Sequence, residues 1–162
     1  MHLNKWPGWS DWNHLSNLDW HEVPKGPGTY MIGTDRPLKR AVGIDQEGIL
    51  DIGKSKGLRG RLQTFYRCAS MPETGGHMAG WRFAFYEMSR HFPLETLYVC
   101  WCPVPSEGLA AREEGRLLDE YVRQHMEPPP LNYSASWRHL RKEDAAANHV
   151  VAATLALQGR GK

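Results

Sequence analysis

The segment 48–62 constrains the fold of this chain more than any other stretch. After Gly48 it has a largely apolar run at 49–52, breaks at Gly53, and continues with Leu58 and Leu62 spaced i, i+4. The apolar run predicts a short strand, and the leucine spacing predicts a helix that follows almost at once. We therefore expect a strand that passes directly into a helix.

The junction between this strand and helix is rich in cations. It carries Lys54, Lys56, Arg59 and Arg61. Cations that a strand delivers at its end suit an anionic ligand, and phosphate is the first candidate. The alternative is an exposed basic helix on an ordinary α+β domain, and this stretch alone leaves both interpretations open.

The whole chain fits one folded domain. Its 162 residues are enough to bury a core, and 41% of them are apolar. The net charge of +2 is too small to indicate nucleic-acid binding, so any basic surface must be local. Cys68, Cys100 and Cys102 lack the number and spacing of a disulfide framework or zinc finger. With no apolar leader and no membrane-length apolar run, we expect a cytoplasmic protein.

Periodicity and turn signals predict the other elements. We expect strands at 29–32, 49–52 and 96–102, with 41–44 extending a strand, and the first two as antiparallel neighbours. Helices are expected at 57–66, 78–90 and 106–126, with a further helical stretch at 143–158. The fold class is α+β, an α/β sandwich with a small three-stranded, mostly antiparallel sheet flanked by helices. We divide the chain into a Trp-rich extension (1–25), a main domain (26–133) and a helical tail (134–162).

The helix expected at 106–126 has a carboxylate on its apolar face. Ser106 supplies its N-cap, and three consecutive prolines stop it. Steps of 100° per residue put Glu114 in the middle of the stripe that contains Leu117, Leu118 and Tyr121. Burying a carboxylate is costly without a partner or metal. Two explanations stay open: a salt bridge to a neighbouring arginine, or a functional role.

Taken together, these pieces resemble the signature of the GIY-YIG nucleases. The matching pieces are Gly28-Thr29-Tyr30, Asp51-Ile52-Gly53, the basic run 54–62, Glu114 with the leucines behind it, and the Pro-Pro-Pro-Leu-Asn segment that ends at Asn132. The resemblance covers roughly residues 26–133. It implies a metal-dependent endonuclease that hydrolyses DNA phosphodiester bonds on a small mixed sheet.

The resemblance also implies a role for each matched residue. Tyr30 would hydrogen-bond the attacking water or the scissile phosphate, and Arg61 would hold a phosphate oxygen. Glu114 would be the single metal-binding carboxylate, for Mg²⁺ or Mn²⁺. Asn132 would brace the site through its amide. His77 is similar to the histidine of the restriction-enzyme branch, which assists at the water or phosphate.

The chain departs from the family pattern in three places. Asp51 stands where the second motif normally begins with tyrosine; it could act as general base, bind the metal beside Glu114, or mark a site that has lost efficient chemistry. Phe65 stands where repair nucleases carry a tyrosine, for which Tyr66 could substitute. The separation between Tyr30 and Asp51 is about twice the usual one, which we interpret as a longer hairpin.

The leading interpretation is therefore an endonuclease whose partner is DNA, with Lys54, Lys56 and Arg59 as further nucleic-acid contacts. One alternative is a catalytically impaired domain that keeps the scaffold as a DNA-binding module. Another is a domain whose basic patch binds an acidic protein. The sequence does not decide between a monomer and a homodimer, nor which DNA sequence or structure is recognised.

Overall fold

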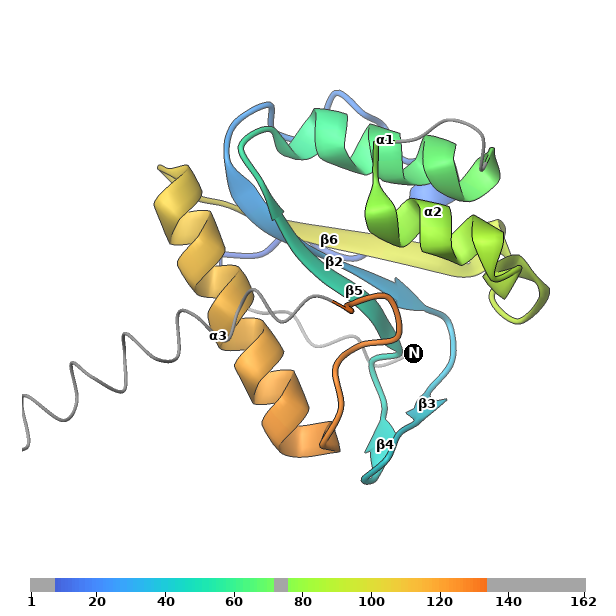
Figure 1. Cartoon of the computed structure of the whole chain (residues 1–162). Helices are drawn as coiled ribbons and strands as arrows, with labels where there is room; N and C mark the ends of the chain where they lie inside the picture. Colours follow the sequence, from blue (N-terminus) through green and yellow to red (C-terminus); the bar gives the residue numbers. More distant parts are fainter. Residues whose placement is uncertain (1–7, 72–75, 134–162) are drawn as a thin grey trace, which may run out of the picture.

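The computed structural model describes residues 8–71 and 76–133 and shows a mixed α+β fold (Figure 1). The main sheet has four antiparallel strands in the order β1-β6-β2-β5. These strands are β1 (Asn13–His14), β2 (Gly28–Thr34), β5 (Ile49–Ser55) and β6 (Leu97–Pro103). A small second sheet pairs β3 (Leu38–Lys39) with β4 (Ile44–Asp45) in the connection between β2 and β5.

Helices cover both faces of the main sheet. They are α1 (Leu58–Ser70), α2 (Met78–Phe85) and α3 (Glu107–His125), with short 3₁₀ turns at Leu15–Asn17, Met88–Arg90 and Leu94–Thr96. Figure 1 shows α1 and α2 side by side on one face and α3 on the other. Each face has its own apolar core, one with Leu58, Leu62 and Phe65 of α1, the other with Leu117 and Leu118 of α3.

The expectation of a three-stranded sheet is wrong, because the sheet has a fourth strand. Asn13 and His14 pair with Val99 and Tyr98 at the outer edge of β6. The residues that follow them belong to the domain as well, since Leu15, Leu18 and Val23 lie in the core shared with α1 and α2. A strand of two residues has no period of its own, so only its tertiary pairing identifies it.

Several element boundaries also differ from the expected ones. Strand β2 runs from Gly28 to Thr34 and not only over 29–32, and of the strand extension expected at 41–44 only Ile44 lies in a strand, β4. Strand β5 does not break at Gly53 but continues to Ser55. Helix α1 extends to Ser70 instead of ending at residue 66. Helix α2 stops at Phe85 instead of residue 90, because Glu87 adopts a left-handed conformation with φ 51°. Helix α3 agrees with expectation, and its Ser106 cap accepts from Leu109 N–H at 3.3 Å.

The described residues contain no helix long and apolar enough to cross a membrane. The helical stretch expected at 143–158 lies outside the described residues, as do residues 1–7 and 72–75.

Candidate active site

The site is built around Tyr30, in the middle of β2. Every residue of β2 is buried, and Tyr30 faces the core beneath α1 and α2. Its partner in register on β5 is Gly53. A Cβ atom on Gly53 would collide with the Tyr30 hydroxyl and ring, so the glycine leaves the space that the phenol occupies.

His77 holds the Tyr30 hydroxyl from the start of α2. It is the N-cap residue of that helix and only 2% exposed. Its Nδ1 accepts from Gly80 N–H at 3.4 Å, so the ring proton sits on Nε2, which lies 3.0 Å from Tyr30 Oη. Burial lowers the His77 pKa to about 3, so the ring is neutral and donates to the phenol oxygen at neutral pH.

Asp51 lies on the same face of β5, two residues before Gly53, and is 3% exposed. Burial raises its pKa to about 6, against the fields of Arg61 and Arg82 and a hydrogen bond from Tyr30, which lower it. With the His77 proton pointing at the phenol oxygen, the Tyr30 proton is free to point at Asp51. The three side chains therefore form a chain of donors that ends on a carboxylate.

Arg61 brings a guanidinium to this cluster from the first turn of α1. One of its terminal nitrogens donates to Gly76 O at 3.4 Å, and its charge acts on Tyr30, Asp51 and Glu114. Its Nε is buried, yet it has no hydrogen-bond partner among the described residues. A buried guanidinium N–H without an acceptor is unusual, and a phosphate oxygen is an acceptor that would satisfy it.

Glu114 approaches from the other side, across the edge of β5. Its carboxylate accepts from Lys54 N–H, one of the backbone groups that this edge strand turns outward. Burial raises its pKa to about 7; Lys54 and Arg61 oppose that shift, and Asp51 adds to it. Glu114 thus completes a group in which Tyr30, Asp51, Arg61 and Glu114 all act on one another electrostatically.

Asn132 fixes the same edge of β5. Its Oδ1 accepts from Ile52 N–H at 2.9 Å and its Nδ2 donates to Ile52 O at 2.8 Å. The neighbouring Leu131 N–H donates to Leu50 O at 2.9 Å. These contacts satisfy the outward-facing groups of an edge strand. Asn132 therefore braces the backbone on the C-terminal side of Asp51, and both ends of its amide are used in doing so.

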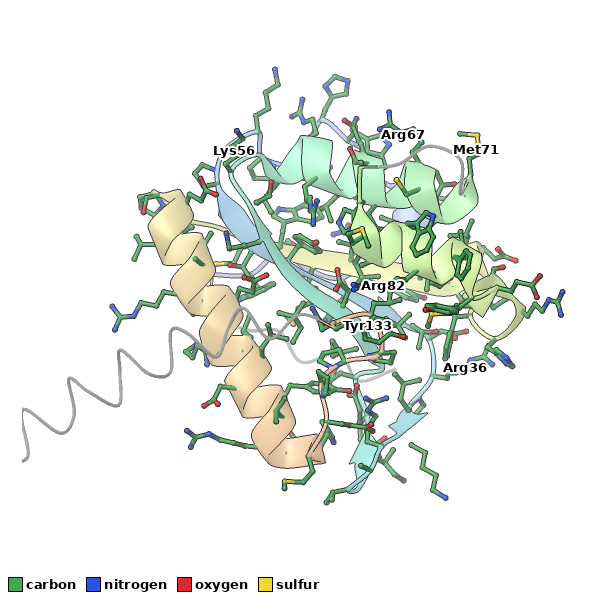
Figure 2. All side chains as sticks on the ribbon, in the orientation of Figure 1. Arg36, Lys56, Arg67, Met71, Arg82 and Tyr133 are labelled. Carbon is green, nitrogen blue, oxygen red and sulfur yellow. The ribbon has the colours of Figure 1, made fainter. Side chains whose placement is uncertain are left out.

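The three residues expected as further nucleic-acid contacts have different surroundings. Lys56 is exposed in the turn before α1 (Figure 2), and the Lys54 amine lies 3.8 Å from Glu107 on α3. Arg59 donates to Val23 O and His21 O, both at 2.9 Å, so its guanidinium anchors the N-terminal segment. Lys56 is the cation that this geometry leaves most open to a ligand.

The aromatic positions after Arg61 have structural surroundings. Phe65 is fully buried and meets the His77 ring edge-on, with 5.1 Å between ring centroids. Tyr66 packs against Trp20 with ring centroids 6.3 Å apart. Tyr66 therefore does not replace a tyrosine at position 65, and the phenol of this site is that of Tyr30.

The acidic groups of the site can be tested against a metal ion. Asp51 and Glu114 are coupled carboxylates, and each raised pKa reflects negative charge that burial disfavours. Within residues 8–71 and 76–133, no group of three or more His, Cys, Asp or Glu side chains could enclose a metal. Two carboxylates nevertheless fit Mg²⁺, which keeps several waters and takes its remaining ligands from substrate phosphate.

A cavity of about 630 Å³ lies elsewhere, between α3 and the β4–β5 connection. Its lining includes Asp45, Glu47, Arg116 and Gln124, and none of the side chains assigned to the site, which are Tyr30, Asp51, Arg61, His77, Glu114 and Asn132. We place the candidate site at Tyr30 and Glu114 and not at this cavity, because the titratable groups with shifted pKa values and the unsatisfied guanidinium N–H lie there.

Sequence reasoning missed Arg82. This α2 residue acts on Asp51 and donates to Leu131 O at 3.0 Å, while its guanidinium lies 4.4 Å from the centre of the Tyr133 ring. Figure 2 shows it extending from α2 towards Tyr133. One signal was available: α2 has no acidic residue three or four positions away to pair with Arg82.

No protein-family model, curated protein or solved structure matches this chain. The interpretation of the site therefore depends on its geometry and on the sequence pattern described above.

Proposed function

We propose that this protein is a metal-dependent endonuclease that hydrolyses DNA phosphodiester bonds. One observation carries the proposal. A phenol from β2, a carboxylate and a guanidinium from the segment 48–62, and a carboxylate from α3 meet in one electrostatically coupled group, and a buried N–H of the guanidinium has no acceptor among the described residues. Perturbed, mutually coupled titratable groups of this kind cluster at functional sites.

The side chains divide the work as follows. Arg61 donates its unsatisfied Nε–H to a phosphate oxygen and offsets the charge that develops there. His77 orients Tyr30, because its Nε2–H donates to the phenol oxygen and leaves the phenol proton to point at Asp51. Asp51 accepts the proton of the attacking water. With a pKa of about 6 it is ionised at neutral pH and still basic enough to hold that proton.

Glu114 is the residue that would hold a divalent cation, with Asp51 as its acidic neighbour. When bound there, Mg²⁺ or Mn²⁺ supplies Lewis-acid polarisation of the phosphate and stabilises the leaving oxygen. The Lys54 N–H fixes the orientation of the Glu114 carboxylate, and Asn132 keeps the strand that carries Asp51 in place.

The proposal is tested by plasmid cleavage with the purified full chain in Mg²⁺ or Mn²⁺. We expect nicked or linear product, and Glu114→Ala should remove it. The matched control is Glu113→Ala. Glu113 directly precedes Glu114 on α3, but its carboxylate is bound to Arg116 with N–O distances of 2.8 and 3.0 Å. Its loss should therefore leave cleavage unchanged.

Two outcomes would redirect the proposal. The protein could fail to cleave plasmid, flap and nicked DNA in every metal and still bind DNA with an affinity that falls with salt. That result would show a binding module on this scaffold. Equal cleavage by wild type and Glu114→Ala would exclude Glu114 from the chemistry.

A further inference from the structure

Helix α2 exposes an aromatic face that neither the fold nor the catalytic proposal uses. Phe85 and Met78 are each 58% exposed and Tyr86 is 55% exposed. Trp81 stacks on Phe85 with 4.5 Å between ring centroids and 18° between ring planes. Met78, Trp81 and Phe85 are spaced i, i+3, i+7 and share one side of the helix. Together with Tyr86, the C-cap residue of α2, these three residues form what we call the α2 aromatic face.

Helix α2 also has a buried side, so the exposure of the aromatic face is not the result of a loosely packed helix. Ala79, Gly80 and Phe83 form the buried side of the helix. Gly80 lets α2 approach α1 so closely that a Cβ there would collide with Phe65 O, which lies 2.6 Å from the ideal position. The aromatic side chains are thus held outward by a tightly packed helix, and exposed apolar clusters of this kind mark contact surfaces.

The helix pair that carries the α2 aromatic face has a basic excess, which suits an anionic partner. Helices α1 and α2 contain four arginines, Arg59, Arg61, Arg67 and Arg82, and no aspartate or glutamate. Helix α3, on the opposite face of the sheet, contains five acidic residues against three arginines, so it has an acidic excess; the acidic residues are Glu107, Glu113, Glu114, Asp119 and Glu120. A surface that combines planar apolar rings with arginines matches nucleic acid, whose bases offer flat faces and whose backbone offers phosphates.

The α2 aromatic face is also tied to the candidate active site by the helix itself. His77, which holds Tyr30, is the cap of α2, and Arg82, which acts on Asp51, lies in its middle. At a rise of about 1.5 Å per residue, Trp81 and Phe85 lie roughly 6 to 12 Å along the axis from His77. A base stacked there would be within about a nucleotide or two of the scissile phosphate.

We infer that the α2 aromatic face stacks an unpaired nucleotide beside the cut, so that the substrate class is DNA with a single-stranded or unpaired element at the cleavage position. In an intact duplex the faces of the bases are covered by their neighbours, and only an unpaired or extruded base can stack on a protein ring. This inference rests on the proposed function and adds the structure of the substrate to it.

The test is binding of the full chain to three fluorescent DNAs of one sequence: a duplex, a single strand, and a duplex with a single-stranded flap. Ca²⁺ replaces Mg²⁺ so that the probes stay intact. We expect Phe85→Ala to weaken flap and single-strand binding about 5- to 150-fold, since one stacked base contributes roughly 1 to 3 kcal/mol. Duplex binding should change less than about twofold.

Two matched variants separate stacking from simple apolar contact and from damage to the fold. Phe85→Tyr keeps a ring and should bind the flap like the wild type, whereas Phe85→Leu keeps an apolar side chain without a ring and should resemble Phe85→Ala. Leu109→Ala removes a 45% exposed apolar residue from α3 and should have no effect on any probe. Circular dichroism melting confirms that each variant folds.

The failure of this inference differs from the failure of the nuclease proposal. If the wild type cuts DNA but binds duplex and flap equally, or if Phe85→Ala weakens all three probes alike, the face has no role in recognising unpaired DNA. If Phe85→Ala leaves DNA binding intact and changes the oligomeric state instead, the face binds another copy of the chain and the inference is overturned. If the wild type neither binds nor cuts any DNA, the proposed function itself is wrong.

Discussion

Two buried aspartate–tyrosine pairs lie on opposite faces of the sheet, and they differ in how far their polar atoms are satisfied. Asp45 accepts from the backbone N–H groups of residues 47, 48 and 49 at 2.7 to 3.1 Å and from Tyr121 Oη at 2.9 Å. Asp51 is equally buried, yet within the described residues it receives a hydrogen bond from Tyr30 and none from the backbone. The Asp45 carboxylate thus accepts hydrogen bonds from backbone N–H groups of the turn that it shapes. The Asp51 carboxylate of the candidate site can still accept further hydrogen bonds.

The same contrast separates two arginines in the first turn of α1. Arg59 donates to two carbonyls of the N-terminal segment, while the buried Nε of Arg61 has no partner among the described residues. Of these two arginines, two positions apart on one helix, Arg59 is therefore bound by the fold, and Arg61 keeps a buried donor for a ligand, as the proposed function requires. The contrast can be tested by removing one member of each pair at a time.

The largest effect is expected from the arginines. Arg61→Ala should lower the rate of DNA cleavage about 10²- to 10³-fold, as the loss of one aimed donor to a developing charge does elsewhere. Arg59→Ala should keep most of the cleavage but lower the free energy of unfolding by roughly 1 to 2 kcal/mol, since two carbonyls lose their donor. Cleavage assays and urea melts on both variants measure the two quantities.

The opposite pattern would end the distinction between the two arginines. A loss of cleavage in Arg59→Ala at unchanged stability would make Arg59 a phosphate ligand and Arg61 a structural residue. Equal losses in both variants would mean that the basic turn binds DNA through its summed charge alone.

The next effect compares the two aspartates directly. Asp45→Asn places an amide N–H₂ against groups that donate to the carboxylate, so it should lower the free energy of unfolding by about 3 kcal/mol. Asp51→Asn should raise the free energy of unfolding by roughly 2 to 3 kcal/mol, measured at pH 8 in EDTA. In a separate assay with Mg²⁺, the same variant should not cleave DNA. The folded-state pKa of Asp51 is about 6, above the ordinary 3.8, so holding the ionised form in the fold is unfavourable.

This gain in Asp51→Asn has a pH dependence that identifies its cause. The wild type loses stability as the pH rises from about 4 to 6, because the folded state holds its Asp51 proton longer than the unfolded chain does. The two proteins should therefore differ at pH 8 and converge near pH 4. A difference that stays constant from pH 4 to 8 would point to packing and not to charge.

The sequence predicts those features whose causes are local. Helix α3 needs only Ser106 at one end, a run of prolines past the other and an apolar stripe between them, and all three can be read within 25 residues or so. Strand β1 is different, because two polar residues join the sheet only through their pairing with β6. The length of α2 depends on a single left-handed residue, Glu87, whose conformation no pattern announces.

The candidate site shows the same division. The family resemblance supplied Tyr30, Arg61 and Glu114, and the structure brings them together with Asp51. It could not supply Arg82, whose partner in the site lies 31 positions away in the sequence, or the space that Gly53 leaves for a phenol on the neighbouring strand. Both are consequences of strand register and helix packing, which a single sequence specifies only through the whole fold.

The smallest effect concerns His77, for which we compare the neutral, hydrogen-bonded ring with the protonated ring. The folded-state pKa is about 3, below the ordinary 6.5, so the stability that the neutral ring contributes is present above pH 6.5 and is lost as the pH falls towards 3. His77→Asn keeps a side chain that can cap α2 but cannot titrate. Relative to this variant, the wild type should lose about 1 kcal/mol of stability by pH 5.5, measured by urea melts at each pH.

The opposing pKa shifts of Asp51 and Glu114 are common to both proteins and cancel in the difference. A difference independent of pH between 5 and 7 would mean that the ring is hydrated in the folded state, and that Tyr30 is not held by the neutral Nε2–H donor that the site requires.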